Sequence, residues 1–212
     1  MQRQKVIVNG KQRTKPSGGF VNSQPLRVGA VMTPRLGSLD LQSARERPEL
    51  LARPVLAAIL GPIGNQAFVA EIDPGLADTA ALTAAHGLNP DDSANCVIVL
   101  GKRGGDLRPA ACVILSSTRA DVNGIVRKHL DARKASFAPQ EWAIDETTME
   151  YGGITPVGLP AAWPILIDRA VAEREWVIVG SGLRRSKIVL AGSALSLLAG
   201  AVVLDGLGKP VG

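Results

Sequence analysis

A short glycine-rich loop is the part of this sequence best suited to chemistry. Two adjacent glycines and a nearby proline occur in the order Gly152, Gly153, Ile154, Thr155 and Pro156. Glycine permits positive φ and lets the backbone approach a ligand closely, while proline restricts the loop. Such a loop can direct successive N–H groups at one point, where they stabilise an oxyanion or bind a phosphate or carboxylate. The residues alone leave this function and a tight structural turn as open alternatives.

Conventional catalytic side chains are scarce elsewhere. The two histidines, His86 and His129, each fall at the C-terminal end of a predicted helix, where a cation interacts favourably with the helix dipole. Neither has a second His or Cys at ligand spacing, so we expect no metal site. Cys96 and Cys112 lie in apolar runs and are predicted to be buried thiols in a reducing compartment. A thiol enzyme that uses one of them is the weakest alternative.

Glycine clusters in this chain do not have the spacing of nucleotide-binding motifs. Residues 101–105 lack the ending of a phosphate loop, and residues 152–156 lack the G-x-G-x-x-G pattern. No G-x-S-x-G elbow is present for an acyl-transfer serine, and the segment 180–182 lacks the strand-to-helix pattern that would follow one. If the chain is an enzyme, we expect it to work without a cofactor.

The elements that would position the glycine loop alternate between the periods of strands and helices. Asp78 is the expected N-cap of one helix and Gly87 its C-terminal stop, while Pro48 and Pro54 interrupt an earlier helical segment. Strands are predicted at residues 67–72, 97–100, 110–115, 165–167, 176–179, 188–190 and 202–204, and helices at 78–86, 121–130, after Pro139 and at 194–198. This mixture predicts an α/β fold with a mixed, partly antiparallel sheet packed by short helices.

Charge is unevenly distributed along the chain. The net charge is +5, but residues 1–34 carry six basic side chains and no acid, which leaves 18 basic and 19 acidic side chains in the remainder. Residues 1–34 are predicted to be a basic, disordered N-terminal extension, and residues 35–212 a folded domain. Within that domain, residues 102–134 hold eight basic and three acidic side chains. They indicate either a basic face or a solvated surface with scattered charges.

Composition also bears on partners and compartment. Only 3% of the residues are aromatic, so an aromatic platform for stacking bases is not expected. The apolar run at residues 188–204 is broken by Gly and Ser, which is typical of a strand, a helix and a strand rather than of a membrane span. The N-terminus lacks the apolar core of a secretory signal. We expect a cytoplasmic protein with no membrane partner.

Several segments occur in an order and spacing known from one protein family. The loop at residues 152–156 continues as Val157-Gly158-Leu159 and is preceded by a strand at residues 94–100 and by the segment 131–138. After it come the segment 164–168 and the strand and small-residue turn at residues 177–184, which ends in an arginine. Together they resemble the YbaK/prolyl-tRNA-synthetase-associated editing domain family, whose G-x-x-x-P loop is similar to residues 152–156. The resemblance covers roughly residues 40–205.

The resemblance implies a trans-editing aminoacyl-tRNA deacylase, which hydrolyses the ester of a small mischarged amino acid on tRNA. Aminoacyl-tRNA would be the partner, an aminoacyl-tRNA synthetase a candidate second partner, and DNA none. The N–H groups of Gly152 and Gly153 would stabilise the oxyanion while water attacks with help from the ribose hydroxyl. The residues expected to bind the substrate are Asn95, Ile154, Thr155, Pro156, Gly180, Ser181, Gly182 and Arg184.

Two positions depart from the family pattern. The family commonly has a lysine where this chain has Asn95, which keeps hydrogen bonding and loses the charge. In what is expected to be the last turn, its editing members often have an acid where this chain has Lys187, whose charge would either replace the missing lysine or be solvated. The change at Asn95 supports the alternative function, a non-catalytic tRNA- or synthetase-binding protein of the same fold.

Overall fold

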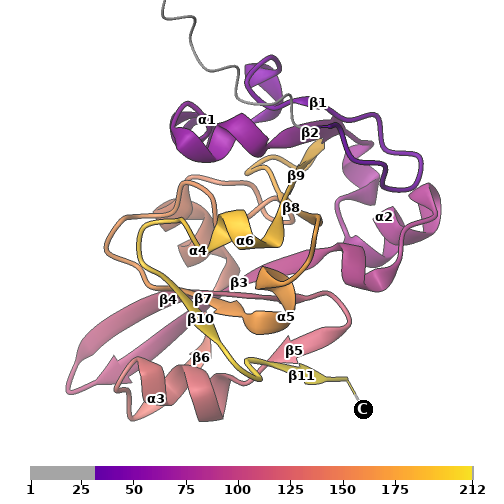
Figure 1. Ribbon diagram of the computed structural model, residues 1–212. Coiled ribbons are helices and arrows are strands. Elements are labelled where there is room, and N and C mark those ends of the chain that lie inside the picture. Colours follow the sequence, from indigo (N-terminus) through magenta and orange to yellow (C-terminus); the bar gives the residue numbers. More distant parts are fainter. Residues whose placement is uncertain (1–31, 212) are drawn as a thin grey trace, which may run out of the picture. The chain divides into compact units, whose positions relative to one another are not determined.

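Two main sheets organise the chain in the computed structural model, which describes residues 32–211 (Figure 1). The first sheet is antiparallel, and the second is parallel among β10, β7 and β4 and antiparallel from β4 through β3 to β6. The first has the order β1 (Gln42–Ser43), β2 (Phe68–Glu71), β9 (Ser186–Leu190), β8 (Val177–Gly180). The second has the order β10 (Ala201–Leu204), β7 (Ile165–Asp168), β4 (Asp106–Leu115), β3 (Ala94–Arg103), β6 (Lys134–Phe137). The predicted mixed α/β fold is confirmed.

Short helices and one further strand pair complete the described residues. The helices are α1 (Arg53–Ile59), α2 (Thr79–His86), α3 (Arg127–His129), α4 (Gln140–Thr147), α5 (Arg169–Ala172) and α6 (Gly192–Leu195). A π-helical turn at Val122–Val126 runs into α3, and 3-10 turns lie at Pro48–Leu50, Pro62–Gln66, Pro74–Leu76 and Pro90–Asp92. The strand pair joins β5 (Thr118–Ala120) to β11 (Gly208–Pro210). Each 3-10 turn starts with proline, whose fixed φ suits the first helical position.

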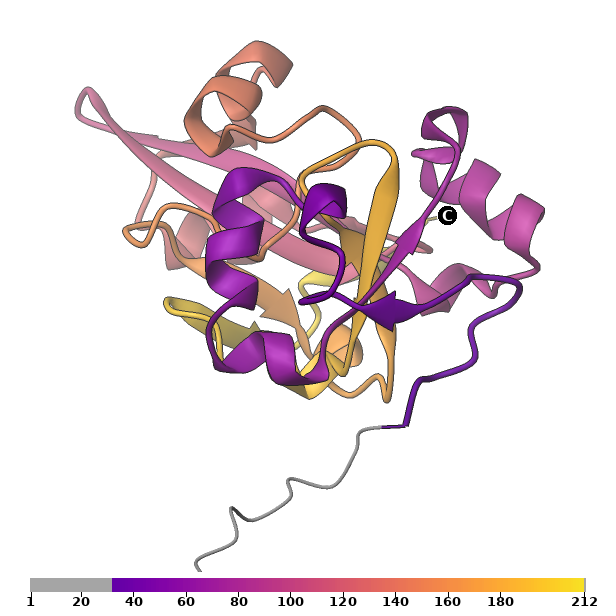
Figure 2. The same cartoon turned by 90° about the horizontal axis from the view of Figure 1, so that it is seen from above.

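Alternation along β8 and β9 gives the first sheet two apolar faces, because successive side chains of a strand point to opposite sides. Val179 and Ile188 lie in the same core cluster as the buried side of α1. Ile178 and Val189 instead pack with Leu82 of α2. Helices α1 and α2 therefore cover opposite faces, and the view from above shows them on different sides of the two strands (Figure 2).

The second sheet separates two cores in the same way. Ile165 and Ile167 of β7 belong to the core cluster that includes α1, whereas Leu166 packs on the other face. That other face is covered by the π-helical turn and α3, through Val126 and Leu130. Strand β3 begins near α2 and runs across the molecule towards α3 (Figure 1). Strand β3 therefore extends from the part of the molecule near α2 to the part near α3.

Most predicted elements are present, but one hairpin, the start of one helix and one edge strand differ from the prediction. The β3–β4 hairpin is longer than predicted, since its strands stay in register to Arg103↔Asp106 and only Gly104 and Gly105 form the turn. Both glycines have positive φ, as the favoured two-residue hairpin turn requires. The helix predicted at residues 121–130 begins as a π-helical turn, because the Asp121 carboxylate accepts from the Gly124 and Ile125 N–H groups. Strand β6 was missed because its largely exposed edge position produces no apolar alternation.

The predicted division of the chain at residue 34 stays a prediction. Residues 1–31, where most of the expected N-terminal extension lies, are outside the described residues. Among residues 32–211, no helix is long and apolar enough to cross a membrane.

Candidate active site

A pocket of about 260 Å³ lies where the start of β3 meets β8 and the N-terminal end of α2. The two sheets come together here, since Ser93 forms an isolated parallel bridge with Ile178. The pocket is lined by residues from α2 and its cap, β3, the glycine loop, β8 and β9, namely Ala77, Asp78, Thr79, Leu82, Ser93, Ala94, Asn95, Cys96, Val97, Tyr151, Gly152, Ile154, Ile178, Val179, Gly180 and Lys187. Polar groups therefore converge on it from segments far apart in the sequence.

The cap of α2 fixes one wall of the pocket. The Asp78 Oδ1 accepts from the N–H groups of Ala80 (2.9 Å) and Ala81 (3.3 Å), which confirms Asp78 as the predicted N-cap. The next residue, Thr79, donates its hydroxyl to the Asn95 Oδ1 at 2.9 Å. Because this bond uses the carbonyl oxygen of Asn95, its amide NH2 keeps two donors for a ligand.

Lys187 supplies the only lysine ammonium among the lining residues. It lies on the same face of β9 as Val189, which is the face that α2 covers, and its side chain is buried with 6% of the residue exposed. Its Nζ donates to the carbonyls of Ala77 (2.8 Å) and Gly152 (3.3 Å), and no carboxylate of the described residues pairs with it. Burial lowers the pKa of Lys187 to about 8, an effect that the Asp78 charge opposes. The alternative that Lys187 is solvated is therefore wrong.

Two cations orient the backbone of the glycine loop. The Arg184 guanidinium donates through Nη1 to the Tyr151 carbonyl (3.1 Å) and through Nη2 to the Pro74 carbonyl (3.2 Å), while Lys187 holds the Gly152 carbonyl. In a trans peptide the C=O and N–H point in opposite directions, so the Gly152 N–H points away from Arg184. Gly152 has φ of +80°, which favours glycine at this position. Arg184 itself is not among the lining residues and braces the loop from outside.

Gly153 differs from its neighbour. Its N–H donates to the Glu150 carbonyl at 2.9 Å, and its own carbonyl accepts from the Gly182 N–H at 2.8 Å. A Cβ at this position would lie 2.7 Å from the Leu183 backbone, so no larger side chain fits. Of the two N–H groups predicted to stabilise an oxyanion, the one of Gly153 is engaged in the turn, and only Gly152 lines the pocket.

The other predicted residues divide between the pocket and its support. Asn95, Ile154 and Gly180 line the pocket. Thr155, Pro156, Ser181 and Gly182 are buried outside it. Ser181 Oγ hydrogen-bonds to Ser186 Oγ at 2.8 Å, and a Cβ on Gly182 would come within 2.3 Å of the Ala52 side chain. These four residues shape the turns behind the pocket and do not line it, and their predicted part in substrate binding stays a prediction.

Sequence reasoning missed Thr79 and Tyr151 as pocket residues. Thr79 follows an N-cap, and helix N-termini attract anions, which is the one signal in the sequence that could have pointed to it. Tyr151 precedes the glycine loop and has an exposed ring. No comparable signal exists for Tyr151, since its place at the pocket depends on how the loop folds back against β8.

Thiol and metal chemistry gain no support from this geometry. Cys96 lines the pocket and is partly buried, and burial raises the pKa of its thiol, so the nucleophilic thiolate is disfavoured. Cys112 is buried, and burial raises its pKa to about 12. In the described part of the chain, no group of three or more His, Cys, Asp or Glu side chains could hold a metal ion.

Solved structures share this arrangement of sheets and helices. One, provisionally described as a trans-editing enzyme for prolyl tRNA synthetase, aligns with a TM-score of 0.63 and 20% identity, over 74% of this chain and 96% of its own. A second, of a hypothetical protein, gives a TM-score of 0.63 and 22% identity, over 73% of this chain and 99% of its own. At such identities the likeness shows the fold. No curated protein matches the chain.

The family is shown by sequence. The pattern of the aminoacyl-tRNA editing domain matches residues 73–196, which is more than half of the chain and includes every residue that lines the pocket. The chain therefore belongs to the aminoacyl-tRNA editing domain family, and the resemblance noted from the glycine loop and its flanking segments is confirmed.

Proposed function

We propose that the chain is a trans-editing aminoacyl-tRNA deacylase, which hydrolyses the ester between a small mischarged amino acid and the terminal ribose of tRNA. One observation carries the proposal within this family: a small pocket brings together the Gly152 backbone, the Asn95 amide and the buried ammonium of Lys187. The name of one solved relative, a trans-editing enzyme for prolyl tRNA synthetase, agrees with it. A synthetase partner and a cytoplasmic location stay predictions.

The size of the pocket bears on which substrates enter. About 260 Å³ is below the range of about 300 to 1,000 Å³ that is usual for ligand pockets, so a compact amino acid and part of the ribose would fill it. Its apolar lining includes Ile154, Leu82 and Val97. Such walls exclude larger side chains by steric clash, but they separate substrates that differ by one methylene by only about 1 to 3 kcal/mol. Selection would be by size.

The proposed reaction needs no protein nucleophile. The oxygen of a water molecule, oriented by the neighbouring ribose hydroxyl of the substrate, adds to the ester carbonyl carbon. Negative charge then develops on the carbonyl oxygen, where the Gly152 N–H and the Lys187 ammonium stabilise it; one such donor contributes about 3 kcal/mol. The bond from this carbon to the ribose oxygen breaks, the ribose oxygen takes the proton lost by the water, and the free amino acid leaves.

Lys187 also weakens the alternative of a non-catalytic binding protein. That alternative depended on the missing lysine at Asn95. The pocket nevertheless contains an ammonium, from β9 instead of β3, and Asn95 adds neutral donors beside it. A charge lost from one strand and present on a strand of the other sheet leaves the pocket able to stabilise an anion.

The decisive experiment is a deacylation assay. Purified protein is incubated with mischarged Cys-, Ala- and Ser-tRNA, and we expect amino acid release well above the buffer rate for at least one of them. The Lys187→Met variant should lose at least tenfold in rate, because the oxyanion loses its ammonium. The matched control, Lys209→Met, removes an exposed lysine on β11 and should behave as wild type. Release at the buffer rate with all three substrates would leave only the binding-protein alternative.

A narrower test concerns the Gly152 backbone. In Gly152→Ala the added Cβ would lie 2.9 Å from Arg184 Nη1 at a φ of +80°, so the guanidinium must move away from the loop that it braces and hydrolysis should fall at least tenfold. Gly206→Ala is the control: its φ is +67°, and its Cβ would meet only the Lys209 Nζ, at 3.6 Å. Both variants place an L side chain at positive φ, which should cost each about 1 to 2 kcal/mol of stability, and displacing Arg184 adds to the loss only in Gly152→Ala. Unchanged hydrolysis by a folded Gly152→Ala protein would remove the loop from the mechanism.

A further inference from the structure

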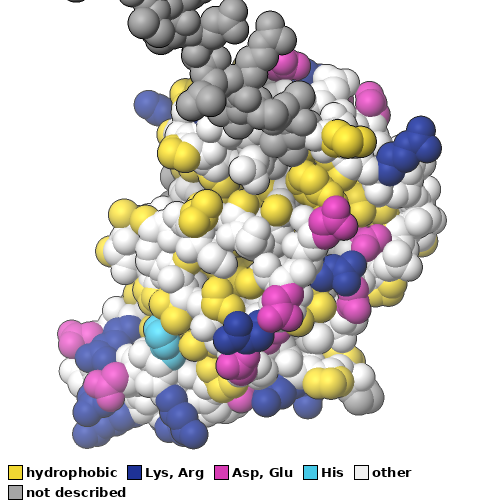
Figure 3. All heavy atoms as spheres, in the orientation of Figure 1, with side chains coloured by type: hydrophobic (Ala, Val, Ile, Leu, Met, Phe, Trp, Pro, Cys, Tyr) yellow, Lys and Arg dark blue, Asp and Glu magenta, His cyan; other side chains and the backbone are white. Residues whose placement is uncertain are grey.

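Positive charge is concentrated away from the pocket. The described residues carry 18 basic and 19 acidic side chains, and eight of these bases but only three of the acids fall within residues 102–134. The fold brings the two ends of this segment together, because Lys102 on β3 pairs with Lys134 on β6. Lys and Arg side chains accordingly gather over the outer end of the β3–β4 hairpin and α3, at the lower left of Figure 3. The predicted basic face is thus present as a surface feature.

An open groove of about 600 Å³ runs through this surface. We call it the basic groove and define it by its lining residues, which are Leu100, Lys102, Asn123, Arg127, Arg133, Lys134, Ala135 and Ser136. They come from β3, the π-helical turn with α3, and the edge strand β6, with Arg133 directly before β6. Four of the eight are cations, and the uncharged polar residues Asn123 and Ser136 add hydrogen-bonding groups.

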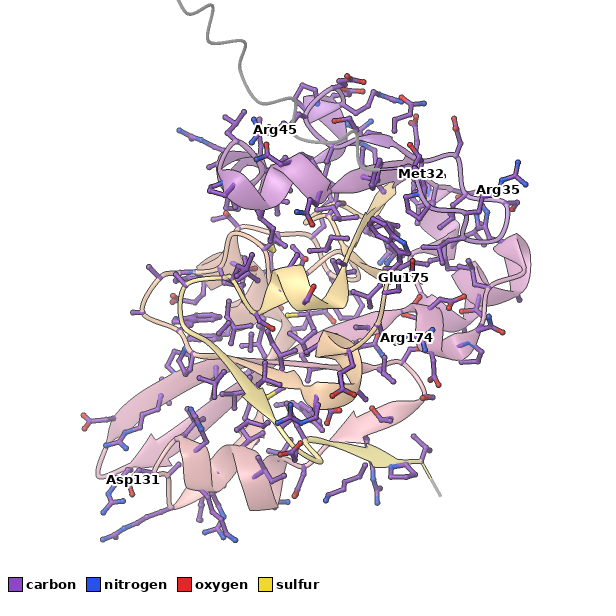
Figure 4. All side chains as sticks on the ribbon, viewed as in Figure 1. Met32, Arg35, Arg45, Asp131, Arg174 and Glu175 are labelled. Atoms are coloured by element: carbon purple, nitrogen blue, oxygen red, sulfur yellow. The ribbon has the colours of Figure 1, made fainter. Side chains whose placement is uncertain are left out.

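The cations of the basic groove are unpaired within the described residues. The nearby carboxylate of Asp131 pairs instead with Arg103 and Arg108, at the hairpin end where Figure 4 labels it. None of Lys102, Arg127, Arg133 and Lys134 takes part in a salt bridge in this part of the chain. The groove therefore offers four positive charges that no carboxylate of residues 32–211 pairs with.

One pair of these charges is unfavourable for the fold itself. Lys102 and Lys134 are direct register partners in the antiparallel ladder of β3 and β6. Like charges directly opposite each other on neighbouring strands are destabilising. An anion bound between them would turn this repulsion into two attractions, which gives the pair a physical reason to bind a ligand.

The groove suits phosphates better than bases. Its lining contains no aromatic side chain, so it lacks the rings on which bases stack. Exposed Lys and Arg side chains with neighbouring hydroxyl and amide groups are the usual contacts to a nucleic-acid backbone, and they position a duplex without reading its sequence. Duplex RNA is recognised mainly through its shape, its phosphates and its 2′-hydroxyls.

Strand β3 connects the groove to the pocket. Asn95 lines the pocket and Lys102 lines the groove, seven residues apart on the same extended strand. At about 3.3 Å per residue, the Cα atoms of these two residues are about 23 Å apart along the strand, and their odd separation directs the two side chains to opposite faces of it. A ligand that occupies both must be long and carry charge far from its reactive end, which describes a nucleic acid esterified at its 3′ end and excludes a free aminoacyl ester.

We propose that the basic groove binds the phosphodiester backbone of the RNA stem whose aminoacylated 3′ end enters the pocket. The identity of this RNA as the substrate rests on the proposed deacylase function, whereas its binding in the groove does not. Contacts to the backbone make binding independent of stem sequence and strongly dependent on salt.

The test uses a variant that weakens binding without weakening the fold. Lys102→Glu reverses one groove charge and places an acid opposite Lys134, so the repulsive pair becomes attractive and stability should stay equal or rise. The control, Arg53→Glu, makes the same charge change at the exposed start of α1, where an acid suits the helix N-terminus. Equilibrium binding of deacylated tRNA is measured between about 50 and 200 mM salt. Urea unfolding of each protein gives its stability.

We expect Lys102→Glu to weaken tRNA binding at least fivefold at the lowest salt and to flatten the salt dependence by about one phosphate contact, while Arg53→Glu binds as wild type. Equal weakening by both variants would mean that net charge alone matters and would overturn the groove. Binding of Lys102→Glu within twofold of wild type would overturn it as well. Wild-type protein that binds polyglutamate and not tRNA would assign the groove to an acidic protein partner.

Hydrolysis separates failure of the groove from failure of the proposed function. Aminoacyl-adenosine carries the ester without the RNA stem, so Lys102→Glu should hydrolyse it at the wild-type rate while its KM for mischarged tRNA rises at least fivefold. If wild type hydrolyses both substrates and Lys102→Glu changes neither KM, the deacylase stands and the groove fails. If wild type hydrolyses neither but binds tRNA in a way that Lys102→Glu weakens, the groove stands and the deacylase fails.

Discussion

Among the residues that line the pocket, Lys187 has the environment that bears most directly on the chemistry of the site. A lysine with 6% of its surface exposed has lost most of its hydration, and its Nζ donates to two backbone carbonyls without a carboxylate partner among residues 32–211. Burying an ammonium in this way is costly, and proteins usually shift the pKa or pair the charge. Here the pKa is lowered to about 8, so the ammonium still predominates at neutral pH. The arrangement has a clear use if a negative charge forms beside it during reaction.

The first residue-scale prediction concerns pH. Because the pKa of Lys187 lies below its usual value, the ammonium is lost as pH rises through about 8. The ratio of enzymatic to buffer hydrolysis should therefore be flat near neutral pH and fall above about pH 8. Rates for wild type and Lys187→Met, measured from about pH 6 to pH 10, check this, since the variant should lack the fall. A wild-type ratio that keeps rising through pH 9 would contradict a role for the ammonium.

At the scale of elements, helix α2 does more than cover the first sheet. Its N-cap Asp78 ties down the first turn, and Thr79 in that turn fixes the Asn95 amide across the pocket. Ala77, which precedes this cap, presents the carbonyl that accepts a hydrogen bond from the Lys187 ammonium. The start of α2 thus places a carboxylate, a hydroxyl and a backbone carbonyl, those of Asp78, Thr79 and Ala77, at one pocket. The same Asp78 charge raises the pKa of Lys187 against the effect of burial.

Asp78 should therefore have separable effects on stability and on pH dependence. Asp78→Ala removes the cap and should lower the free energy of unfolding by about 1 kcal/mol, measured by urea denaturation. Asp78→Asn keeps a capping side chain, so its stability should stay close to wild type. It also removes the negative charge that supports the Lys187 ammonium, so the fall in hydrolysis should begin at lower pH. Identical pH profiles for wild type and Asp78→Asn would mean that Asp78 acts as a cap only.

For the whole molecule, strand β9 connects the core to the site. Ile188 is fully buried against the cluster that contains α1, while its neighbour Lys187 points to the opposite face and enters the pocket. Because adjacent residues of a strand face opposite ways, packing of Ile188 fixes where Lys187 lies. The position of the ammonium is thus set by the hydrophobic core.

Loss of the packing around Ile188 should lower the stability of the protein strongly. Ile188→Ala should lower the free energy of unfolding by about 2 to 5 kcal/mol, because a cavity opens in a closely packed core. Leu197→Ala is the matched control, since Leu197 is 80% exposed and its truncation should change stability by less than about 0.5 kcal/mol. Chemical denaturation of the two variants gives both values. Similar small losses for both would show that this side of the first sheet is loosely packed.

Local signals account for the parts of the fold that were predicted. The strands at β2, β4, β7, β8 and β9, helix α2 with its cap and stop, and the mixed α/β class follow from periodicity and turn residues that act over a few positions. The edge strand β6 was missed because its backbone pairing with β3 is a long-range contact. Its side chains are largely exposed, so its sequence shows no alternation of apolar and polar residues. The π-helical turn depends on a single side chain, Asp121, that redirects two N–H groups.

By itself, the sequence determined the family and the fold class and marked the glycine loop as a candidate site, because these depend on the order of motifs along the chain. Only the tertiary structure decided which of those residues line the pocket. It placed Gly152, Asn95 and Gly180 on the pocket, moved Gly153, Ser181 and Arg184 behind it, and brought in Lys187 from β9. The physical reason is that a binding site is an intersection of several chain segments, and burial, backbone pairing and desolvation at that intersection arise only when the segments meet.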